Sequence, residues 1–156
     1  MTIARFLTGL IIVVFVLLSG CGSDAVNKME CTGYYVVNRT TVVDVVNLMP
    51  DGRYAHYYID PDGNRVQDLN TWTYDSSLGY SLVALNDWYE SFQGSSKGHG
   101  SGTRCFPVDR SGSRVRLTIN DDLGQYYYLK SSNWQEAERV FDSLADIFFG
   151  TRSVDK

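Results

Sequence analysis

The sequence predicts a mainly β fold, an antiparallel meander that forms a small barrel or half-barrel with one C-terminal α-helix packed on it. The first observation is the composition, since eleven tyrosines and many Val and Thr residues favour β-strands. The second is that short apolar or alternating segments are separated by turn sequences rather than by helices. The third is a single segment near the C terminus with the spacing of an amphipathic helix.

The first half of the chain contains three strand-like segments separated by glycine turns. Residues 34–37, 40–49 and 53–59 are rich in β-branched and aromatic side chains. Pro-Asp-Gly occurs at 50–52 and again within 60–64, where Pro suits the second position of a turn and Gly accepts a positive φ. Two such turns close together predict consecutive hairpins.

The second half continues in the same style. Residues 71–74 and 80–88 are strand candidates on either side of a short turn. Residues 114–120 alternate apolar and polar side chains, which predicts a half-buried strand, and 125–130 form another strand after a second turn. Strands at this spacing predict an antiparallel meander, curled or closed so that few strand edges remain exposed.

Residues 133–149 have helical spacing instead. Asn133 and Glu136 form a plausible capping pair at the start, and Gly150 is a suitable end. The polar face is mostly acidic, whereas helices that lie on membranes favour Lys and Arg, so we expect the helix to pack on the sheet or to close one end of a barrel. The apolar stripe consists of Trp134, Ala137, Phe141, Leu144 and Phe148.

An apolar run near the N terminus predicts export. Residues 6–18 follow Arg5 and are almost wholly apolar, but they are too few for a membrane span, which needs about 20 residues. A basic start, an apolar run of this length and small residues before a cleavage site are typical of a secretory signal peptide. The site itself, Leu-Ser-Gly-Cys at 18–21, resembles the bacterial lipobox.

The lipobox resemblance implies a lipid anchor at Cys21. In lipobox proteins the Cys sulfur receives a diacylglycerol, the preceding peptide is removed, and the new amino terminus is acylated. Residues 1–20 would then be a lipoprotein signal peptide, and two or more acyl chains would attach the chain stably to a membrane. Gly22 in place of Asp favours the outer membrane, with the protein facing the periplasm. An ordinary signal peptide or a short anchor with a chance cysteine is the alternative.

The rest of the chain is expected to form a lipidated tether at 21–30 and a single β-rich domain at 31–156. The formal net charge of −4 argues against a nucleic-acid partner and against electrostatic adhesion to anionic lipid. We therefore expect membrane attachment through the acyl chains and an envelope protein as a further partner.

Two cysteines remain after Cys21. In an oxidising compartment Cys31 and Cys105 are expected to form a disulfide, with two free buried thiols as the alternative. A metal pair is disfavoured, because the chain has no Cys-x-x-Cys spacing and its two histidines, His56 and His99, lie in unrelated contexts. No cofactor or metal is expected.

Residues 48–85 resemble the lipocalin-like pattern of small bacterial lipoproteins, in which L-x-x-D-G-x-Y precedes a second turn, G-T-W and an apolar strand. Asn70 replaces the Gly of G-T-W. The resemblance implies a small β-barrel or half-barrel and no substrate, since fold does not fix function. The matching positions are Leu48, Asp51, Gly52, Tyr54, Asp62, Gly63, Thr71, Trp72 and the strand Leu82–Leu85.

Three features of the sequence resemble binding sites. The acidic residues of 60–64 lack the Gly and Glu spacing of an EF-hand calcium loop, so a hairpin turn is preferred. The Gly-rich segment 94–104, which holds His99, is a candidate interaction loop that lacks a P-loop ending. Strand alternation sends Tyr57 to one face and Tyr54 and Tyr58 to the other, so one set is expected in the core and the other exposed for interaction.

The sequence thus predicts a lipid-anchored cell-envelope protein that is not an enzyme. One function is a protein-interaction module, such as an assembly accessory, an inhibitor or an immunity-type protein. The other is a lipocalin-like carrier of a small apolar ligand inside the barrel, which would need an internal cavity. An enzyme ranks third, because the sequence offers no paired acid, base or nucleophile.

Overall fold

The structure is a computed structural model, and it describes residues 25–38, 43–60, 63–88 and 102–150. The predicted signal peptide, Cys21 and His99 lie outside the described residues. Within these ranges, no helix combines the length and the apolar character that crossing a bilayer requires.

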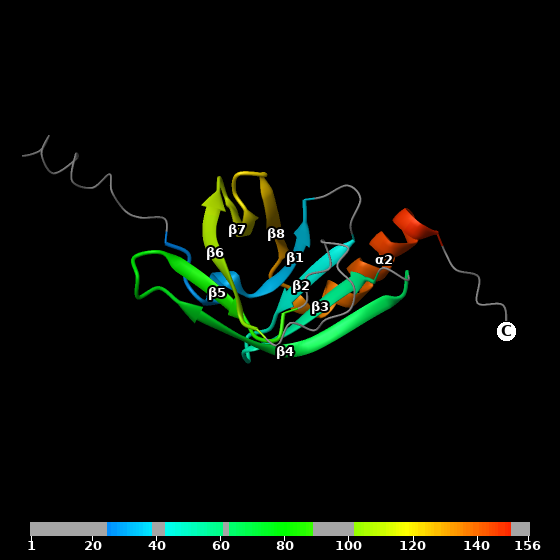
Figure 1. The fold of residues 1–156 in the computed structure, drawn as a ribbon, viewed down its shortest axis with the longest axis horizontal. Coiled ribbons are helices and arrows are strands. Elements are labelled where there is room, and N and C mark those ends of the chain that lie inside the picture. The colour runs from blue at the N-terminus through cyan, green and yellow to red at the C-terminus, as the bar shows by residue number, and fades with distance from the viewer. Residues whose placement is uncertain (1–24, 39–42, 61–62, 89–101, 151–156) are drawn as a thin grey trace, which may run out of the picture.

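Eight antiparallel strands form a closed barrel in which each strand pairs with the next and β1 pairs with β8 (Figure 1). The predicted fold class is therefore confirmed, and the barrel is lipocalin-like in architecture. The strands are β1 (Gly33–Val37), β2 (Asp44–Leu48), β3 (Arg53–Ile59), β4 (Arg65–Asp75), β5 (Ser81–Leu85), β6 (Arg104–Ser111), β7 (Arg114–Asn120) and β8 (Gln125–Ser131).

Alternation along the strands sends one set of side chains into the barrel and the other outward. The interior set is strongly aromatic and includes Tyr35, Trp72, Phe106 and Tyr127, all 2% exposed or less. A second apolar cluster lies on the outside of β1, β2 and β3. These strands are therefore buried on both faces.

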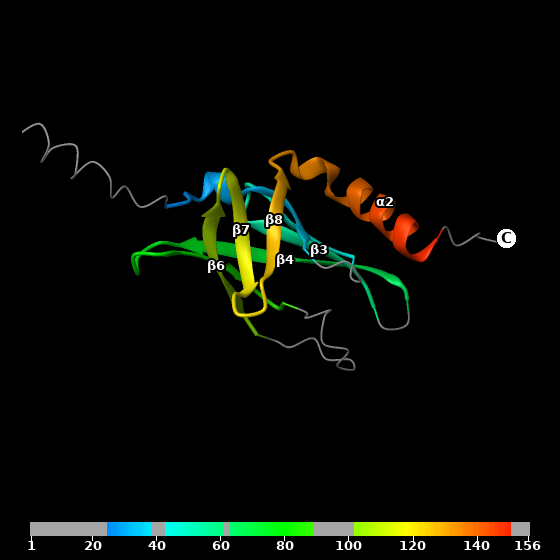
Figure 2. The same ribbon diagram turned by 90° about the horizontal axis from the view of Figure 1, so that it is seen from above.

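The C-terminal helix covers the second cluster. A short 3-10 turn, η2 (Trp134–Glu136), leads into α2 (Ala137–Phe149), which Figure 2 shows lying over β3. Phe141 is 3% exposed and its ring centroid lies 5.7 Å from that of Tyr57. Arg65 of β4 pairs with Asp142, N to O 2.9 Å, and with Asp146 of the helix. The predicted packing of the apolar stripe on the sheet is confirmed for its members from Trp134 to Leu144.

The start of the predicted helix differs from expectation, whereas its end agrees with it. Asn133 makes no side-chain capping bond, so the expected pair with Glu136 is wrong and the first turn is 3-10. Gly150 ends the helix as expected, with φ 76° and its N–H bonded to the carbonyl of Asp146. Phe148 is 48% exposed, because the last turn of α2 extends past the strands that it covers.

The barrel has two ends of different character. We call base the end at which β1, β3, β5 and β7 begin, and mouth the end at which they finish. The base carries the N-terminal segment and η1 (Met29–Cys31), which lies beside the hairpin of β4 and β5 in Figure 1. The C-terminal end of α2 lies on the far side of the molecule from that segment.

Candidate functional site

The three tyrosines predicted to be divided between core and surface are all buried. Tyr54 and Tyr58 point into the barrel, where they are 1% and 3% exposed. Tyr57 lies on the opposite face from these two, as the alternation predicts, but α2 covers it and it is only 6% exposed. The prediction of an exposed tyrosine surface is therefore wrong, because the helix covers the outward face of β3.

A buried polar cluster lies in the lumen near the mouth. His56 of β3 places Nε2 at 3.0 Å from Oδ2 of Asp44, the first residue of β2. The other oxygen of Asp44 accepts a hydrogen bond of 2.8 Å from the hydroxyl of Tyr127 in β8. Asp44, His56 and Tyr127 are each 0% exposed. Three strands thus contribute to one hydrogen-bonded group inside the barrel.

Trp88 covers this group from the mouth. Its indole stacks on the imidazole of His56, with ring centroids 4.1 Å apart and planes at 16°. It also meets Phe106 and Tyr127 edge to face, at 5.3 Å and 6.2 Å between centroids. Side chains from β3, β6 and β8 therefore converge on one ring in the lumen.

The turn after β5 directs Trp88 inward. Asp87 has a positive φ of 48°, which is uncommon for a residue other than Gly. Its carboxylate accepts a hydrogen bond of 2.9 Å from the side-chain amide of Asn70 on β4. The N–H of Trp88 is bonded to the carbonyl of Gly102. The strained turn is thus held from two sides, and it places a large ring within the barrel.

The chemistry available to the cluster is limited by its burial. The second ring nitrogen of His56, Nδ1, has no hydrogen-bond partner among the described residues. An unmet polar atom in an apolar interior costs free energy, about 1–3 kcal/mol in mutational data. No group of three or more metal-binding side chains occurs within the described ranges. With Nδ1 unbonded, the cluster can bind a hydrogen-bonding ligand that enters the lumen.

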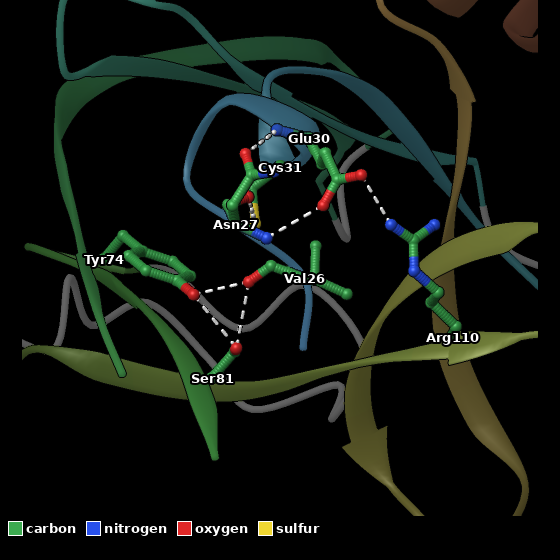
Figure 3. Close-up of polar contacts among 7 residues, drawn as sticks. All are labelled: Val26, Asn27, Glu30, Cys31, Tyr74, Ser81 and Arg110. Atoms are coloured by element: carbon green, nitrogen blue, oxygen red, sulfur yellow. Dashed lines mark hydrogen bonds and ion pairs between the residues drawn. The ribbon is translucent and has the colours of Figure 1, made fainter. Parts of the chain in front are cut away.

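The N-terminal segment is fixed into the base (Figure 3). Val26 is 1% exposed, and its carbonyl accepts hydrogen bonds from the hydroxyls of Tyr74 and Ser81, the latter at 3.0 Å. These two residues stand on β4 and β5, so the segment is attached to that hairpin. The predicted tether at 21–30 is therefore too long, since the folded domain already includes Val26.

A reciprocal pair of hydrogen bonds stabilises the turn that follows. Asn27 donates its N–H to the Glu30 carboxylate at 2.9 Å, and Glu30 donates its N–H to the Asn27 side chain at 3.1 Å. Arg110 of β6 also binds Glu30, at 2.6 Å. These contacts lower the pKa of Glu30, first through the backbone N–H of Asn27 and then through Arg110. η1 is thereby joined to the barrel wall (Figure 3).

The predicted disulfide is not formed. Both cysteines are free, with Cys31 buried in the core and Cys105 exposed on the outside of β6. The Cys31 thiol donates to the carbonyl of Asn27 at 3.3 Å, and burial raises its pKa to about 12. Phe106, next to Cys105, points inward. Strand alternation therefore directs the Cys105 side chain away from the lumen that encloses Cys31.

Searches against protein-family models, curated proteins and solved structures find no significant match to this chain.

The polar cluster was missed from the sequence, although a signal for it was present. Asp44 is in phase with Val46 and Leu48, and His56 is in phase with Tyr54 and Tyr58, so alternation places both on the inward faces of neighbouring strands. Trp88 had no such signal, because it follows β5 in a turn. Of the predicted interaction residues, the structure brings Tyr58 together with His56, at 4.6 Å between ring centroids.

Proposed function

We propose that the protein is a lipid-anchored cell-envelope protein, not an enzyme, that binds a partner protein through its outer surface. One observation favours partner binding over the transport of a small ligand. Trp88 packs against His56, Phe106 and Tyr127 inside the barrel lumen. An eight-stranded barrel has an interior just wide enough for side chains or one small ligand. Because aromatic rings fill this interior, the barrel is better suited to be a rigid scaffold than a container for a ligand.

The outer surface offers a partner an apolar contact at the end of α2. Ile147, Phe148 and Phe149 are 75%, 48% and 57% exposed, and they are consecutive in the chain. Apolar side chains grouped in this way are typical of interaction sites. The helix also carries Asp142 and Asp146 beside them. Arg65 already pairs with both carboxylates, so the best-matched partner is an envelope protein with a complementary apolar surface.

A second candidate, the carrier of a small ligand, is favoured by one specific observation. The Nδ1 atom of His56 is buried without a hydrogen-bond partner among the described residues. Ligand sites in barrels combine apolar walls with a few such polar atoms. A ligand that donates to or accepts from Nδ1 would lie beside Trp88, which stacks on the face of the imidazole.

The anchor is tested by replacing Cys21 with Ser. The variant should incorporate no fatty-acid analogue and should remain as the uncleaved precursor, because the sulfur that receives the diacylglycerol is gone. Cys105→Ser, which removes an exposed cysteine elsewhere, is the matched control and should be labelled normally. Labelling of Cys21→Ser at the wild-type level would refute the lipid anchor.

The partner is tested with a photo-crosslinking residue at position 147 in cells that express the full chain. We expect a discrete protein adduct that is lost when Phe148 is changed to Asp. The same crosslinker at Leu78, which is 64% exposed at the base, should give no such adduct. The carrier would be supported instead if position 147 gave no specific adduct and native mass spectrometry found a stoichiometric small molecule that was released on unfolding.

A further inference from the structure

The base of the barrel carries exposed apolar side chains that the fold does not use. Met29 in η1 is 67% exposed, and Leu78 and Tyr80 in the turn between β4 and β5 are 64% and 54% exposed. The hydrogen bonds from Tyr74 and Ser81 to Val26 attach this hairpin to the N-terminal segment. The three side chains therefore belong to the end of the barrel at which the chain enters the fold.

The length of chain before Val26 limits how far this end can lie from an anchor at Cys21. Val26 lies five positions after Cys21, and a fully extended chain of five residue steps spans roughly 18 Å at most. Val26 cannot move away from the barrel, because its side chain is 1% exposed and its carbonyl is bonded on two strands. A lipid attached at Cys21 would therefore hold the base near the bilayer surface.

The charges at the base suit a phospholipid surface. Exposed cations at this end are Lys28, Arg114 and Lys130. Two of the base carboxylates, Glu30 and Asp51, are paired with Arg110 and Arg53, while Asp75 accepts from the N–H of Ser77.

The mouth has the opposite character. Asp60, Asp87, Asp121 and Asp122 lie at its turns. The cations described at this end are Arg104 and Arg65, and Arg65 pairs with Asp142 and Asp146 of α2. Among the described residues, acidic and basic side chains are thus separated along the barrel. Adhesion to anionic lipid is therefore disfavoured at the mouth and not at the base.

We propose that the base is a membrane-contact surface, in which Met29, Leu78 and Tyr80 enter the lipid interface while Lys28, Arg114 and Lys130 face phosphate headgroups. This inference rests on the proposed acylation of Cys21. Acyl chains supply the attachment, and apolar and basic side chains beside them set the orientation. The mouth and the exposed end of α2 then point away from the bilayer, where a partner protein can reach them.

Two exposed leucines allow a matched test. Leu78 at the base and Leu123 in the turn between β7 and β8 at the mouth are 64% and 66% exposed. Each is changed to Cys in turn and spin-labelled, in a full-length acylated chain that also carries Cys105→Ser. Cys31 remains, since it is buried and its pKa is raised to about 12, which keeps it unreactive.

The labelled proteins are placed in vesicles of phosphatidylethanolamine and phosphatidylglycerol. Collision rates of each label with oxygen, which concentrates in lipid, and with a water-soluble nickel chelate are then compared. We expect the oxygen-to-nickel ratio at position 78 to exceed that at position 123 severalfold. Arg114→Glu with Lys130→Glu should lower the ratio at 78 in these vesicles and leave it unchanged in phosphatidylcholine.

The outcomes separate this inference from the proposed function. Mass spectrometry of the intact protein reports the acyl chains first, and their absence would refute the anchor itself. An acylated protein whose labels at 78 and 123 were equally open to nickel would overturn the membrane contact alone. Shielding of position 78 from both reagents would also overturn it, in favour of a second copy or another protein on the base. Unchanged melting midpoints of both Cys variants verify the fold.

Discussion

The indole of Trp88 and the imidazole of His56 lie face to face in the barrel lumen, with ring centroids 4.1 Å apart. Because Nε2 of His56 faces Asp44, the indole covers one face of a buried histidine and carboxylate pair. The ring that fills the lumen and the ring that carries the unpartnered nitrogen are thus in direct contact. A ligand that bonds to Nδ1 would therefore lie beside the two stacked rings.

Removal of the indole should leave a cavity of its own shape. Trp88→Ala is expected to cost about 3–5 kcal/mol of unfolding free energy, because a large buried ring is lost and the barrel wall relaxes only partly. Added indole should raise the melting midpoint of this variant. Trp134→Ala, which removes a half-buried ring outside the barrel, is the control and should show no rescue. Indole rescue of neither variant would contradict the lumenal role of Trp88.

Gly33 should be essential for closure of the barrel. Its φ is +129°, and a Cβ at this position would lie 2.2 Å from the carbonyl oxygen of Ser131 on β8. Gly33→Ala is expected to cost more than about 4 kcal/mol, the range reserved for severe backbone conflicts. Gly112→Ala, at φ +63° in open space, should cost only about 1–2 kcal/mol. Chemical denaturation of the two variants measures the difference, and equal costs would show that β8 moves aside.

Phe141 should account for much of the packing of α2. Phe141→Ala removes a ring that is 3% exposed and is expected to cost about 3–5 kcal/mol. Glu138→Ala on the exposed face should change stability by no more than about 0.5 kcal/mol. Asp142 is unsuitable as a control, because it pairs with Arg65. A thermal melt of the two variants decides, and an unchanged midpoint for Phe141→Ala would mean that α2 is not anchored by this side chain.

The two described cysteines should differ sharply in reactivity. Burial raises the pKa of Cys31 to about 12, so its thiolate is scarce at pH 8, whereas Cys105 is exposed. Iodoacetamide at pH 8 should therefore modify Cys105 quickly and Cys31 only when the protein unfolds. Cys105→Ser should abolish the rapid phase. Two rapid phases would place Cys31 in solvent, and no rapid phase in freshly reduced protein would place Cys105 in the interior.

The same pKa gives a direction for alkaline stability. The ordinary pKa of a cysteine thiol is 9.0. The unfolded chain therefore releases the Cys31 proton at a lower pH than the folded domain does. Below pH 9 the contribution of the protonated Cys31 thiol to the free energy of unfolding is fully present. This contribution is lost as the pH rises toward 12.

Two strands were predicted with their observed bounds, β3 at 53–59 and β7 at 114–120. Turn sequences mark both ends of β3, and β7 alternates apolar and polar side chains. β6 was missed, since Pro107 argues against a paired strand. The structure explains why it is tolerated: β6 pairs with β5 at Pro107, while its pairing with β7 begins only at Val108. A pattern of residues does not reveal on which side a strand is unpaired.

The errors about the site have a common physical origin. One tyrosine face of β3 is expected at the surface, and the tether is expected to run to residue 30. Instead, α2 covers Tyr57 on the outward face, and the barrel wall encloses Val26 within the predicted tether. Both outcomes depend on contacts between segments far apart in the chain. The Asn-x-x-Glu spacing illustrates the same limit, since it forms reciprocal bonds at Asn27 and Glu30 and none at Asn133 and Glu136.

The pairing of β1 with β8 ties folding to the completion of synthesis. Tyr35 of the first strand lies opposite Leu129 of the last, so residues nearly a hundred positions apart must meet before the barrel can close. Contacts between such distant residues fold slowly, on the millisecond to second scale for β-barrels. A chain that crosses a membrane N terminus first would thus remain open and threadable until its last strand had followed. Truncation before Gln125 would leave β1 with no strand on that side.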